Sequence, residues 1–120
     1  MAKRGSLMTV SHMHKRPDPF ADINIYDFLD FNRWCTVAGR KCLGRASQRH
    51  HGLIGRDRRK SELNVYINYQ ATCENCHTGT GEADSKENHQ RFYRLQCEKF
   101  GKPVVDGWIE GLELIVKPTF

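Results

Sequence analysis

The feature that most constrains this chain is a set of four cysteines arranged as two close pairs. Cys35 and Cys42 follow a C-x6-C pattern, and Cys73 and Cys76 follow a C-x-x-C pattern. Two thiolates in a C-x-x-C turn can face one zinc ion, and four thiolates complete a tetrahedral structural site. We therefore predict that all four cysteines hold one structural zinc ion, with buried core thiols or a redox pair as the alternatives.

The composition indicates that the chain would benefit from the added stability of a structural zinc ion. The chain has 120 residues, of which 38% are hydrophobic and 28% are charged, so we expect one domain with a thin margin of stability. No stretch approaches the roughly 18 apolar residues of a membrane span, and the N-terminus lacks the apolar segment of a signal peptide. We expect a cytoplasmic protein without a membrane partner, in which the cysteines stay reduced. The fifth cysteine, Cys97, is expected to be an ordinary buried thiol.

Positive charge is concentrated in one segment. Nine of the 19 Lys and Arg residues lie between Arg33 and Lys60. Because the guanidinium group matches a phosphate bidentately, a local excess of arginine favours nucleic acid as the partner, and a solvated basic loop is the alternative. The candidate nucleic-acid-binding residues are Arg45, Arg49, Arg56, Arg58, Arg59 and Lys60.

Local patterns predict a flexible N-terminal arm, residues 1–21, followed by a single α+β domain, residues 22–120. A short helix is expected within residues 22–34. Asp22 is expected to cap this helix, and Tyr26 and Leu29 are expected to form its inner face.

The remaining elements follow from periodicity and caps. A short strand is expected to end at the histidine at position 51, and alternation predicts a second strand over residues 63–69. Residues 85–100 are predicted to form the longest helix, with Ser85 as the N-cap and Gly101 as the C-cap. A strand over residues 108–116 is expected to follow.

Residues suited to phosphodiester hydrolysis lie around the second cysteine pair. His50 and His51 are adjacent, Asn68 stands five residues before the C-x-x-C turn, and His77 directly follows it. With this set, residues 35–89 resemble the HNH nuclease family. The resemblance implies a small zinc-braced ββα-metal domain of HNH, treble-clef-like type, here extended by the N-terminal arm and by a C-terminal helix and strand.

The resemblance also implies roles for these residues. An imidazole has the ordinary side-chain pKa nearest to neutral pH, which suits a general base that activates water. By the resemblance that base is His51, and Asn68 braces the loop so that the His51 ring points at the water. A catalytic divalent ion, Mg, Mn, Ni or Zn, would be held by His50 and His77. Arg56 would contact the phosphate.

Two ligand assignments stay open at this point. Gly79 and Gly81 shorten the metal-binding helix of the motif, which leaves Asn88 or His89 as an additional ligand of the divalent ion. Alternatively, His77 completes a Cys3His zinc site if one cysteine of the first pair is not a ligand.

These residues together predict a metal-dependent DNA endonuclease or nickase, acting in a bacterial cell or a phage-infected host cell. The likeness to compact phage-encoded members suggests a bacteriophage or bacterial origin. One alternative is a non-catalytic zinc-braced module that binds nucleic acid or protein, and another is a metal-controlled regulator. The arm and the C-terminal strand are available for a homodimer contact or for a phage protein partner.

Overall fold

Residues 16–55 and 61–112 are described by the structure, a computed structural model, and a two-stranded antiparallel sheet lies at their centre. Strand β2 (Gln48–His51) pairs with strand β3 (Tyr69–Thr72), with the first residue of each opposite the last residue of the other. The predicted strand that ends at position 51 is therefore confirmed. Together with its helices, this part of the chain has the α+β class expected from the sequence.

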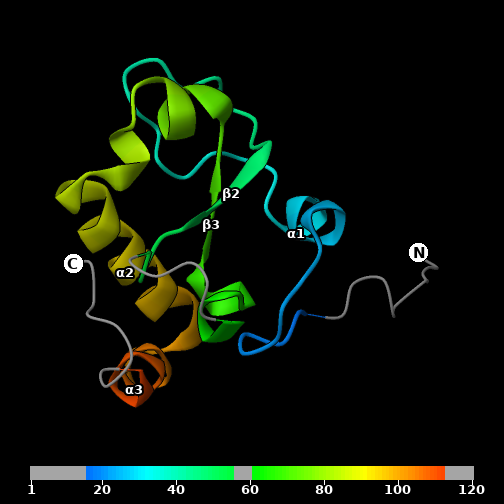
Figure 1. Cartoon of the computed structure of the whole chain (residues 1–120), viewed down its shortest axis with the longest axis vertical. Coiled ribbons are helices and arrows are strands. Elements are labelled where there is room, and N and C mark those ends of the chain that lie inside the picture. The colour runs from blue at the N-terminus through cyan, green and yellow to red at the C-terminus, as the bar shows by residue number, and fades with distance from the viewer. Residues whose placement is uncertain (1–15, 56–60, 113–120) are drawn as a thin grey trace.

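Two helices cover the two faces of the sheet. Helix α1 (Ile25–Phe31) lies on one side and helix α2 (Lys86–Phe100) on the other (Figure 1). The alternation of side chains along β3 explains this arrangement. Tyr69 and Ala71 pack with Phe28 of α1. Gln70, which lies between them on the strand, donates a hydrogen bond to Asn88 of α2.

The predicted short helix is present, but its cap and its inner face differ from the prediction. Asn24, not Asp22, is the N-cap, because its side-chain oxygen accepts a hydrogen bond from the backbone amide of Asp27 at 2.9 Å. Phe28 is the buried residue of this helix, while Tyr26 is 80% exposed. The assignment of Tyr26 to the inner face was wrong, since Tyr26 and Phe28 lie on different faces of a 3.6-residue period. The assignment of Leu29 was right, because Leu29 packs against the cluster that contains Phe28.

The longest helix is confirmed in both position and caps. The Ser85 hydroxyl accepts a hydrogen bond from the Asn88 amide at 3.0 Å, and Gly101 ends α2. Gly101 has a φ of 99°, a backbone conformation that favours glycine, so the chain can turn sharply into the next helix there.

The predicted C-terminal strand is wrong where the structure describes it. Residues 108–111 belong to helix α3 (Lys102–Gly111), and residues 113–120 lie outside the described residues. Val105, Ile109 and Leu112 recur at helical spacing and are buried against α2, which outweighs the strand-like alternation farther along. No helix within residues 16–55 and 61–112 is long and apolar enough to cross a membrane.

The predicted strand over residues 63–69 is also wrong for most of its length. The chain forms two 3-10 turns, Ser61–Leu63 and Tyr66–Asn68, before β3 begins. The backbone amides of Tyr66 and Ile67 donate to the carbonyls of residues 21 and 19, so they are not available for a longer ladder. The end of the predicted arm is thus hydrogen-bonded to the domain, and residues 1–15 lie outside the described residues.

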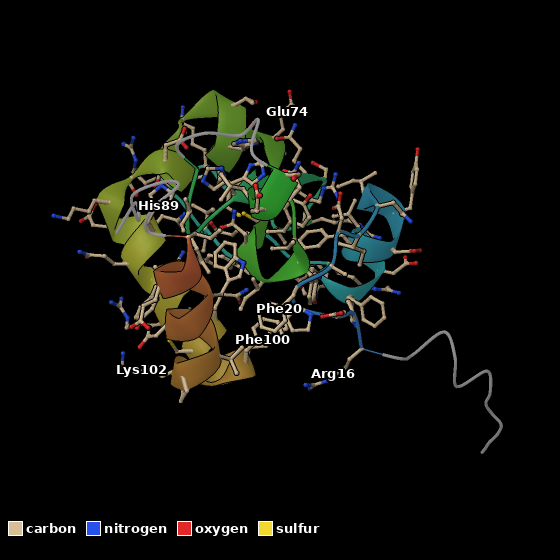
Figure 2. All side chains as sticks on the ribbon, turned by 60° about the horizontal axis from the view of Figure 1, so that its bottom comes forward. Arg16, Phe20, Glu74, His89, Phe100 and Lys102 are labelled. Atoms are coloured by element: carbon tan, nitrogen blue, oxygen red, sulfur yellow. The ribbon has the colours of Figure 1, made fainter. Side chains whose placement is uncertain are left out.

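Three apolar clusters hold these elements together. One packs α2 and α3 against the loop after β2, and it contains Leu53, Ile54, Leu63, Ile67, Phe92, Val105, Ile109 and Leu112. A second lies between α1 and the sheet, where Phe100 at the end of α2 packs against it (Figure 2). The third surrounds the cysteines.

Candidate functional site

The four predicted zinc ligands come together in the third cluster. One sulfur atom from each of Cys35, Cys42, Cys73 and Cys76 lies within 4.8 Å of all the others. Three of these cysteines are buried and Cys42 is half-buried. The four-cysteine group can therefore hold a structural metal ion. His77 is not a member of it.

The wide C-x6-C spacing closes through a tight turn. Ala38 adopts a φ of 54°, and the Cys42 amide donates to the Gly39 carbonyl at 3.2 Å. Backbone amides also point at the sulfur atoms: Gly39 donates to Cys76 at 3.4 Å, and Leu43 donates to Cys73 at 3.3 Å. Such hydrogen bonds stabilise thiolates, which are the form that binds zinc.

The surroundings shift the two thiols of the C-x-x-C turn in opposite directions. Burial raises the pKa of Cys76 to about 12, although the Gly39 amide acts to lower it. At Cys73 burial also acts to raise the pKa, but hydrogen bonds from the amides of Leu43 and Cys76 outweigh it and lower the pKa to about 6. The surroundings therefore favour the thiolate of Cys73 more than that of Cys76.

Cys97 is separate from this group. It is half-buried on α2 and packs against the apolar cluster between α2 and α3. All five cysteines are described, and none forms a disulfide.

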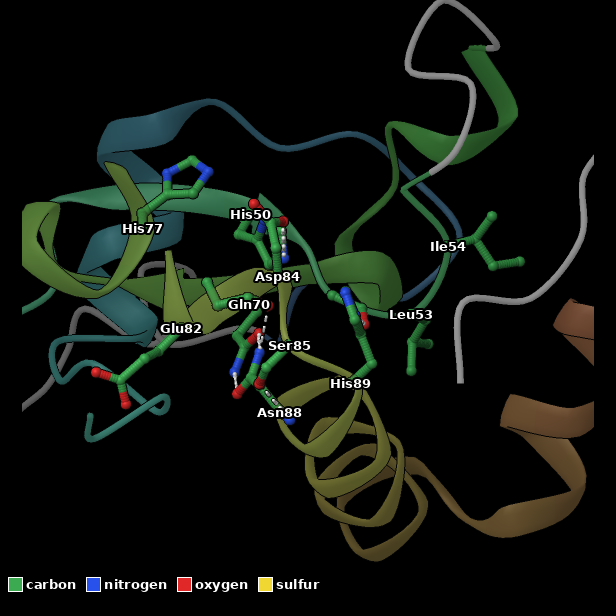
Figure 3. Close-up of polar contacts among 12 residues, drawn as sticks. His50, Leu53, Ile54, Gln70, His77, Glu82, Asp84, Ser85, Asn88 and His89 are labelled. Atoms are coloured by element: carbon green, nitrogen blue, oxygen red, sulfur yellow. Dashed lines mark hydrogen bonds and ion pairs between the residues drawn. The ribbon is translucent and has the colours of Figure 1, made fainter. Parts of the chain in front are cut away.

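A second group of ligand-type side chains lies between β2 and the start of α2. Donor atoms of His50, Asp84 and His89 lie within 4.8 Å of one another. Asp84 ends the 3-10 turn Glu82–Asp84, and His89 lies in the first turns of α2. His50 Nε2 is 3.6 Å from Asp84 Oδ1 (Figure 3).

His50 fits the role of a metal ligand. Its Nε2 is buried and has no hydrogen-bond partner, a costly state for an imidazole nitrogen unless a ligand uses it. Burial is the main reason that the pKa of His50 falls to about 4, and His77 and His89 lower it further, against the opposite effect of Asp84. The ring is therefore neutral at pH 7. Two imidazoles and one carboxylate form a donor set that suits Zn, Mn, Ni or Fe.

The fold also sets which nitrogen of His89 faces this group. His89 Nδ1 donates to the Gly52 carbonyl at 2.6 Å, so Nε2 is the nitrogen that keeps a lone pair. Gly52 permits this contact because a Cβ atom there would lie 2.4 Å from the Phe92 ring. The backbone after β2 can thus approach α2 closely only with glycine at this position.

His77 lies beside this group without joining it. Its ring centroid is 5.0 Å from that of His50, and its Nδ1 donates to Gln48 Oε1 at 2.8 Å. Figure 3 shows His50 between His77 and His89. The predicted pairing of His50 with His77 as metal ligands stays a prediction, and the geometry adds His89, which the sequence left open.

Asp84 is the residue that sequence reasoning missed. It is exposed, and it precedes the N-cap of α2 by one residue. The signal in the sequence is an acidic residue five positions before His89, which is weak without knowledge that β2 passes nearby. Asn88, the other ligand left open, is instead paired with the Gln70 amide through two hydrogen bonds of 2.8 and 3.0 Å.

His51 lies at the end of β2 and on the other face of the strand from His50. Its ring is 5.6 Å from that of Tyr69, the ring that also carries the Arg49 guanidinium 4.4 Å above it. His51 Nε2 is 2.9 Å from Asn64 Oδ1. Because an amide oxygen only accepts hydrogen bonds, His51 Nε2 donates in this contact.

Asn68 holds the loop that follows His51. Its Oδ1 accepts hydrogen bonds from the amides of Leu53 and Ile54 at 3.0 and 2.9 Å. Its Nδ2 donates to the carbonyls of Ile54 and Leu63 at 2.9 and 3.0 Å. Asn68 is completely buried, so all its hydrogen-bonding capacity is used on the backbone of this loop.

This arrangement makes a stability prediction. Replacing Asn68 with alanine leaves four buried backbone groups without partners, and we expect the free energy of unfolding to fall by about 3 kcal/mol or more. Asn75→Ala is the control, since it removes one exposed hydrogen bond to Lys41 and should cost less than about 1 kcal/mol. Urea unfolding followed by circular dichroism measures both, and equal losses would contradict the bracing role.

The predicted nucleic-acid-binding residues are in different situations. Arg45 is exposed. Arg49 donates to the Ile23 carbonyl and stacks on Tyr69, which ties the chain before α1 to the sheet. The four others, at positions 56 and 58–60, lie outside the described residues.

The described chain thus carries a four-cysteine group and a separate histidine–carboxylate group. The first suits a structural ion, because thiolates fill all its positions. The second suits a metal with open positions, because it has only three protein ligands. No family model, curated protein or solved structure matches the chain, so its assignment rests on the chemistry of these side chains.

Proposed function

We propose that this chain is a metal-dependent DNA endonuclease or nickase of HNH type. The observation that carries the proposal is the buried, unpartnered Nε2 of His50 beside Asp84 and His89, next to His51 in the chain. The order of elements, β2, β3 and then α2, agrees with the ββα-metal fold that the resemblance implies. The four-cysteine group would hold the structural zinc that ties the start of this motif to its middle.

In the proposed site, His50, Asp84 and His89 would hold the divalent ion, with His77 beside them. When bound, such an ion supplies positive charge that neutralises the scissile phosphate and the leaving oxygen. Asp84 contributes a negative charge that strengthens the binding of a cation by two neutral imidazoles.

The protein groups proposed to move the proton are on the other face of the strand. The contact with Asn64 orients the His51 ring, and His51 is the proposed base that takes a proton from water. The hydroxide that results attacks phosphorus, and the bond from phosphorus to the leaving oxygen breaks. In this proposal the phosphate lies at the end of β2, where His50 and His51 are adjacent on its two faces.

The test of this function is cleavage of supercoiled plasmid by zinc-loaded protein with Mg, Mn, Ni or Zn, followed on a gel. Nicked or linear product with at least one ion supports the proposal, and single-stranded DNA is assayed in parallel. If neither substrate is cut with any of the four ions, the non-catalytic binding module takes the place of the enzyme.

The ligand set makes a separate prediction. His89→Ala is expected to weaken Mn binding, measured by calorimetry on zinc-loaded protein, by at least about tenfold, because it removes a ligand that Gly52 orients. Cleavage should fall with it and should be partly restored by more Mn. His77→Gln is the matched variant, and we expect it to change Mn affinity less than about threefold. The reverse order of effects would return the ligand role to His77.

A further inference from the structure

A large aromatic side chain is exposed on the segment that carries the first cysteine pair. Trp34 is 65% exposed, although it directly precedes the buried Cys35. It forms an isolated antiparallel bridge with Arg45. Two hydrogen bonds of 2.8 Å flank the bridge, from the Cys35 amide to the Gly44 carbonyl and from the Ala46 amide to the Arg33 carbonyl. In such a pair the two side chains project from the same face of the bridge, so the Trp34 and Arg45 side chains share one side of this segment.

The surroundings of Trp34 are basic. Arg33, Arg45 and Lys41 are exposed, and the Arg40 side chain is 85% exposed, although it lies 3.8 Å from Glu82. The sequence contains no Asp or Glu between Asp30 and Asp57. Leu43, which directly follows Cys42 in the chain, is also 62% exposed. We call this combination the Trp34 surface.

The backbone under the Trp34 surface is fixed. The Thr36 amide donates to the Ala71 carbonyl at 3.0 Å, which attaches the segment to β3. Arg91 of α2 donates to the carbonyls of Thr36 and Val37, which attaches it to the helix. An indole on a fixed backbone loses little conformational freedom when it binds a partner. An exposed indole does not stabilise the fold, so its exposure points to binding.

We propose that the Trp34 surface binds single-stranded DNA, with an unpaired base stacked on the Trp34 indole and a phosphate held by Arg45. The positive charge selects a polyanion, and the aromatic ring selects one with an open base face, which a duplex does not offer. The proposal deepens the proposed function and rests on it, since it assigns an unpaired segment as part of the substrate. Arg45 and His50 are five residues apart, at most about 17 Å of extended chain, so one DNA strand can reach both.

The chain offers a direct spectroscopic test. Its two tryptophans are Trp34 and Trp108, so Trp108→Phe leaves the Trp34 indole as the only one. Zinc-loaded protein is titrated with oligo(dT) and with a duplex of equal length, without added divalent ion, so that binding is measured apart from cleavage. We expect oligo(dT) to quench the fluorescence and to bind more tightly than the duplex.

Substitutions then test the surface itself. Trp34→Ala is expected to lower oligo(dT) affinity, measured by anisotropy, about 5- to 150-fold, while Trp34→Phe retains most of it. Tyr26→Ala is the control, since Tyr26 is an 80% exposed aromatic residue on α1. The affinity of this variant for oligo(dT) should match that of the wild type. Fluorescence that is unchanged by DNA, or wild-type affinity of Trp34→Ala, would overturn the proposal. Trp34 fluorescence that falls as the protein concentration is raised without DNA would also overturn it, because the surface would then bind a second copy of the chain.

The plasmid assay separates this proposal from the proposed function. If plasmid is cut but Trp34→Ala binds oligo(dT) with wild-type affinity, the proposal for the Trp34 surface is wrong and the proposed nuclease function is retained. If oligo(dT) binding depends on Trp34 but no DNA is cut, the nuclease fails and the surface stands as the binding site of a non-catalytic module.

Discussion

Replacing His51 with alanine is expected to lower the rate of DNA cleavage about a hundredfold or more. The reason is that a positioned proton acceptor contributes on this scale, and the contact between His51 Nε2 and Asn64 Oδ1 holds the ring in position. Single-turnover cleavage of plasmid, followed on a gel, measures the rate. Zinc content, folding and oligo(dT) affinity should stay at wild-type values, because His51 belongs to neither the four-cysteine group nor the Trp34 surface.

The response to metal distinguishes this loss from that of a ligand variant. Raising the concentration of the divalent ion should leave His51→Ala inactive, whereas it should partly restore His89→Ala. Asn64→Ala, which releases the ring without removing it, is expected to lose less activity than His51→Ala. Cleavage by His51→Ala at the wild-type rate would remove this residue from the mechanism.

Replacing Cys73 with serine is expected to abolish zinc binding and cooperative unfolding together. Cys73 is completely buried, and its sulfur is part of the four-sulfur group and accepts two amide hydrogen bonds. Structural zinc contributes about 10 to 16 kcal/mol, which equals or exceeds the whole stability of an ordinary small domain. Metal analysis should find about one zinc per wild-type chain and none in the variant, and thermal unfolding should lose its sharp transition.

Cys97→Ser is the matched control for this experiment. Cys97 is half-buried on α2, so the same chemical change there should leave zinc content and the shape of the transition unchanged. Metal-free protein that unfolds as wild type does would show that the cysteine cluster is not a structural metal site.

The parts of the fold that were predicted correctly depend on local signals. Ser85 and Gly101 act within one turn of the helix that they cap, and their roles can be read from neighbouring residues. The 3-10 turns before β3 depend instead on carbonyls at positions 19 and 21, far away in the sequence. Helix α3 forms because Val105 and Ile109 are buried against α2, a tertiary contact that outweighs two glycines within the helix.

The candidate site divides in the same way. The cysteine pairs carry their own spacing, so their grouping was predictable from the sequence. Asp84 has no such signal, because one exposed acidic residue among 14 becomes a ligand candidate only when β2 brings His50 next to it. The placement of His51 on the opposite face from His50 follows from strand alternation, which adjacent histidines in a sequence do not reveal until the strand is known.

The hydrogen bonds of Asn68 have a consequence for sequence variation. One side chain grips the backbone at Ile54 and at Leu63, the two ends of the segment that contains Arg56, Arg58 and Arg59. The loop-closure cost of an unstructured insertion between these anchor points is about 0.6 kcal/mol for each doubling of length. Within the proposed function, we therefore expect that changes to this segment can alter the preferred DNA target while the sheet and both metal-ligand groups are left intact.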